Sequence, residues 1–200
     1  MTQQLLSLAI TLPADLEPDF AVDVARMSGR LGFSAVHLCS VDGGEQLERL
    51  AEAAAPALVV VDPDFPSDEI VRVNDPAAVV AARAEMNAAD VRRPLLVAVP
   101  ISIGRTTSEA IARADLEPRF TGDRHPRQVG IFGTFEQAQD QVLALSRAGA
   151  DGLVLDVPLV RDVADVLAQI RALVVGATPR LVDAPTVRSV PPPRTVFYGE

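Results

Sequence analysis

Lysine is absent from the 200-residue chain, so its 18 basic residues are all arginine. This absence excludes a Schiff-base lysine, a phosphate-loop lysine and a lysine general base. The 27 acidic residues give a formal net charge of -9, and no stretch of the chain concentrates the arginines. A nucleic-acid partner is therefore not expected, because binding to a phosphate backbone requires a basic patch.

Cysteine and histidine are also scarce, with a single Cys39 and only two histidines, His37 and His125. A lone cysteine forms no internal disulfide, and these three residues lack zinc-finger spacing, so no metal is expected. No apolar run approaches the roughly 18 residues of a membrane helix. No basic segment precedes the first apolar run, so we expect a cytoplasmic protein without a membrane partner.

What the chain does contain is a regular alternation of short apolar runs and amphipathic segments. Val-rich runs of strand length predict a parallel sheet buried on both faces, and the segments between them predict crossover helices. Two helix starts carry capping-box pairs, Thr106 with Glu109 and Thr134 with Gln137. The predicted strands are 5–12, 35–41, 57–61, a short 70–73, 95–103 and 153–157, and helices are predicted over 18–31, 47–55, 76–89, 134–147 and 162–173 and from Thr106 onward.

The length limits how complete such a repeat can be. An eightfold βα barrel takes about 250 residues, so we expect a TIM-barrel-like parallel βα repeat that is an incomplete or minimal barrel, of class α/β. Residues 1–176 form this domain, and residues 177–200 form a proline-rich tail. The prolines make the tail extended and non-helical, either wrapped on the body or loose.

Two blocks of sequence carry a family resemblance. LSLAITLP (6–13) followed by SGRLGFSAVHL (28–38), and GIFGTFEQAQDQVLALSRAGADGLVLDVP (130–158), resemble the bacterial-luciferase-like flavin-dependent monooxygenases and their deazaflavin-using relatives. In the first block the pair Gly32-Phe33 matches a "GF" before the second strand. The segments VAVPISIGRTTSEA (97–110) and ARADLEPRF (112–120) resemble the part of the family that precedes the second block.

The resemblance implies an oxidoreductase or monooxygenase that binds FMN or a deazaflavin and acts on a small organic substrate. Two departures stand beside it. The segment between Asp42 and Pro94 has no counterpart of the family's ring-covering and phosphate-binding parts. A histidine after the second strand is replaced by CSVDGG, and His37 lies within the strand, so its catalytic role does not carry over. The architecture resembles the shortened, non-fluorescent flavoprotein relative of luciferase.

Candidate site residues follow the predicted strands, since barrel chemistry sits at the carboxyl ends of strands. Asp42 with Gly43, Asp62 and Asp156 are so placed. Asp42 and Asp62 could bind a flavin or substrate hydroxyl, or they could simply terminate strands and begin helices.

A second candidate lies in the segment from Ile101 to Thr107. Ser102, Gly104, Arg105 and Thr106 combine a strand end, a small residue and a helix start, which suits a cofactor phosphate. Arg105 would pair with that phosphate, although Thr106 also reads as an ordinary helix cap.

The stretch from Glu117 to Gln128 holds Arg119, Arg124, His125 and Arg127. It is either a lid over an anionic ligand or a solvated loop, and His125 is the candidate acid or base. His37 and Cys39 share one strand face and are interpreted as core or barrel-lining residues rather than a reactive pair.

The leading hypothesis is a shortened luciferase-like flavin-dependent oxidoreductase. A non-catalytic flavin-binding or partner subunit of the same fold, and a phosphate-binding barrel enzyme without flavin, stay open. An incomplete barrel leaves apolar edges uncovered, so we also expect a homo-oligomer.

Overall fold

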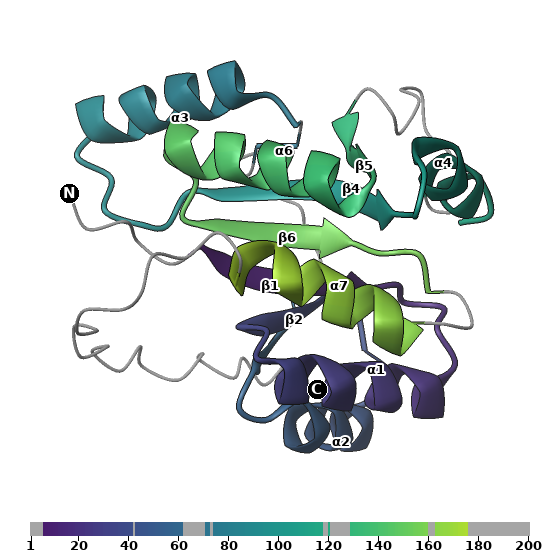
Figure 1. Ribbon diagram of the computed structural model, residues 1–200. Coiled ribbons are helices and arrows are strands. Elements are labelled where there is room, and N and C mark those ends of the chain that lie inside the picture. Colours follow the sequence, from purple (N-terminus) through teal and green to yellow (C-terminus); the bar gives the residue numbers. More distant parts are fainter. Residues whose placement is uncertain are drawn as a thin grey trace.

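The computed structural model describes residues 6–41, 43–61, 71–72, 74–117, 120, 129–159 and 163–175. The strands in this part of the chain all run parallel and form one sheet (Figure 1). They are β1 (Ser7–Leu12), β2 (Ala35–Leu38), β3 (Leu58–Val61), β4 (Leu96–Ile103), β5 (Ile131–Gly133) and β6 (Gly152–Asp156). The helices are α1 (Pro18–Leu31), α2 (Gly44–Ala54), α3 (Pro76–Ala88), α4 (Thr107–Asp115), α6 (Phe135–Ala148) and α7 (Val163–Val175).

Local signals set the ends of the best-predicted helices. α1 begins at Pro18, where the Glu17 carboxylate accepts hydrogen bonds from the backbone N–H groups of the first turn, and it ends at Gly32, whose φ of 78° is left-handed. α6 opens with the reciprocal capping box of Thr134 and Gln137 that the sequence predicts. The helix spans expected from the sequence are confirmed to within a few residues.

The strands depart from expectation in three places. β2 ends at Leu38, so it is shorter than predicted. The predicted strand at 70–73 is reduced to an isolated bridge between Val71 and Val97, with Ile70 and Val73 outside the described residues. The three-residue β5 was not predicted, because so short a segment shows no periodicity.

Within the described residues the sheet is open, with the order β3-β2-β1-β6-β4-β5, so that β3 and β5 are the edge strands of this part. The expectation of a parallel α/β repeat is confirmed, and the described residues form six of its strands. As in a barrel, the last strand, β6, lies beside β1. One pairing differs from consecutive barrel order, because β4 lies between β6 and β5.

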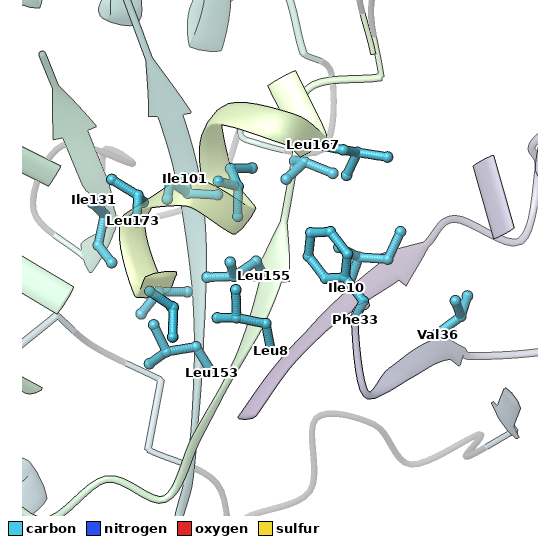
Figure 2. Packing of buried hydrophobic residues seen from close by; sticks show 14 of the residues in the cluster. Leu8, Ile10, Phe33, Val36, Ile101, Ile131, Leu153, Leu155, Leu167 and Leu173 are labelled. Atoms are coloured by element: carbon cyan, nitrogen blue, oxygen red, sulfur yellow. The ribbon is translucent and has the colours of Figure 1, made fainter. Parts of the chain in front are cut away.

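The core lies between the sheet and a row of helices. In Figure 1, α2, α1, α7, α6 and α3 follow one another along the sheet, and neighbouring helices in this row pack together. Alternate strand residues point into this layer, among them Leu8, Ile10 and Leu155. Figure 2 shows Leu167 and Leu173 of α7 among these strand side chains.

The opposite side of the sheet, here called the second face, has a different lining. Its small cluster consists of Ala9, Ala35, Ala98 and Val154, which pair across four neighbouring strands. These residues alternate along their strands with the large apolar residues of the helix-covered face. The centre of the second face thus consists of three alanines and a valine, with Val60 and Leu96 packed against them.

Candidate functional site

Three polar residues form a row on the second face, next to the carboxyl edge of the sheet. Thr11 of β1 is in register with His37 of β2, and the Thr11 hydroxyl makes a short hydrogen bond to the Asp156 carboxylate of β6. The same hydroxyl lies 3.3 Å from the Leu155 carbonyl oxygen. Neighbouring strands lie about 4.8 Å apart, so His37, Thr11 and Asp156 span three adjacent strands in one line.

The row is well enclosed. Thr11 is 7% exposed and His37 is 8% exposed, while Asp156 is half-buried. The small cluster of Ala9, Ala35, Ala98 and Val154 lies one row nearer the amino edge of the sheet and provides an apolar surface next to the polar row. A hydroxyl, an imidazole and a carboxylate thus lie in one row beside an apolar surface. This combination can orient a ligand and exchange protons with it.

A cavity of about 480 Å³ lies at the same edge but on the helix-covered side. It is enclosed by the carboxyl ends of β4 and β5 and by α4 and the N-terminal turns of α6 and α7. Figure 1 shows α4 at the end of the sheet toward which the arrow of β4 points. The lining residues are Ile103, Gly104, Arg105, Glu109, Arg113, Thr134, Phe135, Glu136, Asp165, Val166 and Gln169.

Two of the predicted phosphate-site residues, Gly104 and Arg105, line this cavity. Ser102, Gly104 and Thr106 each support the start or the packing of α4. The buried Ser102 hydroxyl donates to the Ala110 carbonyl oxygen at 2.8 Å. A Cβ added to Gly104 would lie 2.6 Å from the Ala110 nitrogen, so glycine permits close approach of the helix. Thr106 caps the helix by accepting from the Glu109 N–H at 3.1 Å.

Arg105 is the exposed member of this set, with its side chain 92% accessible. Its backbone N–H and its Nε both donate to Glu109 Oε2, at 3.0 and 3.3 Å. The Arg105 backbone N–H, followed by the guanidinium groups of Arg105 and Arg113, holds the pKa of Glu109 below its ordinary value. The Glu109 carboxylate therefore occupies the position where a phosphate would meet the helix and Arg105.

The start of α2 offers a more open backbone. Its N-cap is Gly43, and no side chain caps the helix there. A Cβ added at Gly43 or Gly44 would meet nothing within 4 Å. A second cavity, of about 240 Å³, lies beside this turn and includes Ser40 and Gln46. This turn is thus accessible to a ligand at the carboxyl end of β2.

Several predicted candidates fall outside the described residues. They are Asp42, Asp62, His125 and the arginines Arg119, Arg124 and Arg127, and the tail 177–200 lies outside as well. Among the described residues, no group of three or more His, Cys, Asp or Glu side chains could hold a metal ion. No helix in this part of the chain is long and apolar enough to cross a membrane.

Thr11 is the site residue that sequence reasoning missed. The available signal was a hydroxyl near the end of the mainly apolar run LSLAITLP, two residues before Pro13. Its partner Asp156 was identified as a strand-end residue, but their contact joins positions 145 apart in the chain. His37 lies on the second face, as predicted for a lining residue.

Comparison of the sequence finds no matching family model and no matching curated protein. The fold, by contrast, matches the coenzyme F420-dependent tetrahydromethanopterin reductase of Methanopyrus kandleri, with a TM-score of 0.64 and 10% identity. The match covers 86% of this chain and 99% of the reductase chain.

Two phosphate-chemistry enzymes match more weakly, each with a TM-score of 0.39. A truncated 3-deoxy-D-arabino-heptulosonate 7-phosphate synthase from Thermotoga maritima is 14% identical, with 86% of this chain and 85% of that chain covered. The (S)-3-O-geranylgeranylglyceryl phosphate synthase from Thermoplasma acidophilum is 13% identical, with 84% and 93% covered. The chain thus shares the α/β fold of that reductase.

Proposed function

We propose that the chain is a flavin- or deazaflavin-dependent oxidoreductase of the luciferase-like type, acting on a small organic substrate. The observation that carries the proposal is the fold match to the F420-dependent reductase over 86% of the chain. The blocks of sequence at 6–38 and 130–158 that resemble the same family form β1 to β2 and β5 to β6 in the structure. Fold alone does not fix chemistry, so the residues at the carboxyl edge must fit the cofactor.

The donor set at this edge suits such a cofactor in two places. The ring system of a flavin or deazaflavin needs hydrogen-bond partners on an apolar support, which Thr11 and Asp156 supply above the small cluster. Its phosphate needs close backbone approach, which the open turn at Gly43 and Gly44 permits. When bound, the cofactor supplies hydride or electron transfer.

The chain's own residues would then bind and orient. Asp156 accepts a hydrogen bond from Thr11, so its carboxylate has a fixed direction and a second oxygen directed elsewhere. The apolar surface formed by Ala9, Ala35, Ala98 and Val154 would exclude water from the side of the ligand that lies against the sheet. His37 contributes the imidazole of the same row.

The test is a titration of purified full-length protein with FMN and, separately, with a coenzyme F420-type deazaflavin, followed by absorbance and fluorescence. We expect saturable binding of one of them, and Asp156→Asn should weaken it while Asp23→Asn, on the exposed side of α1, should not. Turnover with the reduced cofactor then distinguishes the oxidoreductase from the alternative, a non-catalytic flavin-binding subunit of the same fold. Failure to bind either cofactor would overturn both.

We further propose that the chain self-associates. Support comes from apolar side chains at both ends of the sheet. Leu58 and Val61, on edge strand β3, are 68% and 39% exposed, and Val80 of α3 is 55% exposed. Light scattering should give the mass of a homo-oligomer, and Leu58→Glu should shift it toward the monomer. A monomeric mass at every concentration would contradict this proposal.

A further inference from the structure

The cavity of about 480 Å³ on the helix-covered side has walls of opposite charge. On one side lies α4, where Arg105 and Arg113 flank Glu109 and leave one net positive charge. On the other side, the first turns of α6 and α7 present Glu136 and Asp165. This separation of charge is independent of the row on the second face, so the inference does not rest on the proposed function.

The state of each wall is fixed by local hydrogen bonds. Glu136 accepts from its own backbone N–H and from the Thr134 hydroxyl, which lowers the pKa of its carboxyl group. Arg113 is anchored by a short hydrogen bond to the Ile103 carbonyl oxygen. Arg105, in contrast, extends into solvent and engages Glu109 through Nε, which leaves its two terminal nitrogens directed to other groups. The negative wall therefore includes a carboxylate whose charged form is favoured, and the positive wall has hydrogen-bond donors available to a ligand.

Ligands of a single charge do not match this arrangement. The three carboxylates outnumber the two guanidinium groups, which opposes a phosphate or another simple anion. A simple cation would be attracted to Asp165 and Glu136 but would leave Arg105 unused. Between the walls, Ile103, Phe135 and Val166 supply an apolar surface. The volume lies in the range of about 300–1,000 Å³ that is typical of small-molecule sites.

We propose that this cavity binds a small zwitterion of the amino-acid type, with its carboxylate on Arg105, its ammonium group on Asp165 and Glu136, and its apolar body between the walls. A charge-assisted hydrogen bond at each end gives the site both affinity and orientation. Gln169, one turn after Asp165 on α7, provides a neutral donor and acceptor beside the ammonium position.

The test uses three probes of nearly the same shape. L-leucine has both charges, 4-methylpentanoate lacks the ammonium group, and 3-methylbutylamine lacks the carboxylate. Each is titrated into isotope-labelled full-length protein, and the amide signals of Gly104 and Thr134 are followed by NMR. We expect saturable shifts with leucine at millimolar concentrations and binding about 10-fold or more weaker for each single-charge probe.

Two variants assign the ends of the ligand. Arg105→Gln should weaken leucine about 10-fold or more and leave 3-methylbutylamine unchanged, whereas Asp165→Asn should weaken leucine and leave 4-methylpentanoate unchanged. Arg26→Gln and Asp23→Asn, an exposed pair on α1, are the matched charge controls and should change nothing. The proposal is overturned if leucine binds no better than either single-charge probe, if it does not bind, or if the controls weaken it as much as the cavity variants.

Discussion

The two edges of the sheet differ in how tightly they are closed. At the amino edge, Asp151 joins three strands: its carbonyl accepts from the Ser7 N–H at 3.0 Å, its N–H donates to the Leu95 carbonyl at 2.9 Å, and its carboxylate accepts from the Leu95 N–H at 2.8 Å. Arg83 of α3 adds a salt bridge to the same carboxylate. The carboxyl edge instead contains two cavities and an exposed guanidinium group.

This difference separates stability from ligand binding. In parallel βα folds the amino edge has no part in the chemistry, so its residues are free to fill space and pair completely. The carboxyl edge must stay accessible to a ligand, so its side chains are packed less tightly. Substitutions at the amino edge should therefore alter the free energy of unfolding strongly, and those at the carboxyl edge should alter it weakly.

The largest expected effect is at Gly29, near the C-terminal end of α1. A Cβ there would lie 2.0 Å from the Ala54 carbonyl oxygen, a backbone atom of α2. Gly29→Ala should thus force the two helices apart and cost about 3 kcal/mol. Gly44→Ala at the carboxyl edge, with nothing within 4 Å, is the control and should change stability by less than about 1 kcal/mol. If urea unfolding gives the two variants the same free energy of unfolding, the proposed difference in stability between the two edges is wrong.

Asp151→Ala should have the next largest effect. It removes the acceptor for the Leu95 N–H and for Arg83, both part-buried, and a charged hydrogen-bonding group of this kind contributes about 1.5–3 kcal/mol. Asp23→Ala removes an exposed partner of Arg26 and should cost less than about 0.5 kcal/mol. The measurement is again urea unfolding, and a cost below that of Asp23→Ala would show that Asp151 does not join the strands.

A contrast between local and long-range contacts explains which features could be predicted from the sequence. α1 was predictable because Pro18 and Gly32 act on their own neighbours. The placement of β4 between β6 and β5 was not, since it depends on packing between distant segments. The row of His37, Thr11 and Asp156 needs the register of three strands, which no local pattern contains.

The Arg105 site shows the converse. The capping pair of Thr106 and Glu109 was visible in the sequence, and the structure confirms the Thr106 half of it. The Glu109 carboxylate turns back to the Arg105 N–H rather than to that of Thr106. Because the Glu109 carboxylate already accepts the hydrogen bond of the Arg105 N–H at this helix start, that donor is not available to a phosphate. The presence of Glu109 in the sequence was therefore the evidence against a phosphate at that position.

Thr11→Val sharpens the comparison on the second face. The change keeps the shape of the side chain and removes the hydroxyl that donates to Asp156, so it should cost about 1 kcal/mol of stability. Its main effect should fall on binding of FMN or a deazaflavin, because Asp156 loses its fixed direction. Thr107→Val, which removes an exposed hydroxyl of α4, is the control. Unchanged cofactor titration in Thr11→Val would remove this row from the site.

The smallest expected effect is a pH dependence at Glu109. The pKa of Glu109 in the folded chain lies below its ordinary value of 4.5, first because the Arg105 backbone N–H donates to the carboxylate and then because Arg105 and Arg113 lie beside it. A lowered pKa means that the folded state favours the ionised form, so this stabilisation is complete above the unfolded pKa and is lost as the pH falls through the folded one. Glu109→Gln should therefore melt at a lower temperature than the original protein at pH 7, and the difference should vanish in acid. Glu48→Gln, on the exposed side of α2, controls for the loss of one negative charge. A melting difference that stays constant or grows on acidification would show that the Glu109 carboxylate does not hold the start of α4.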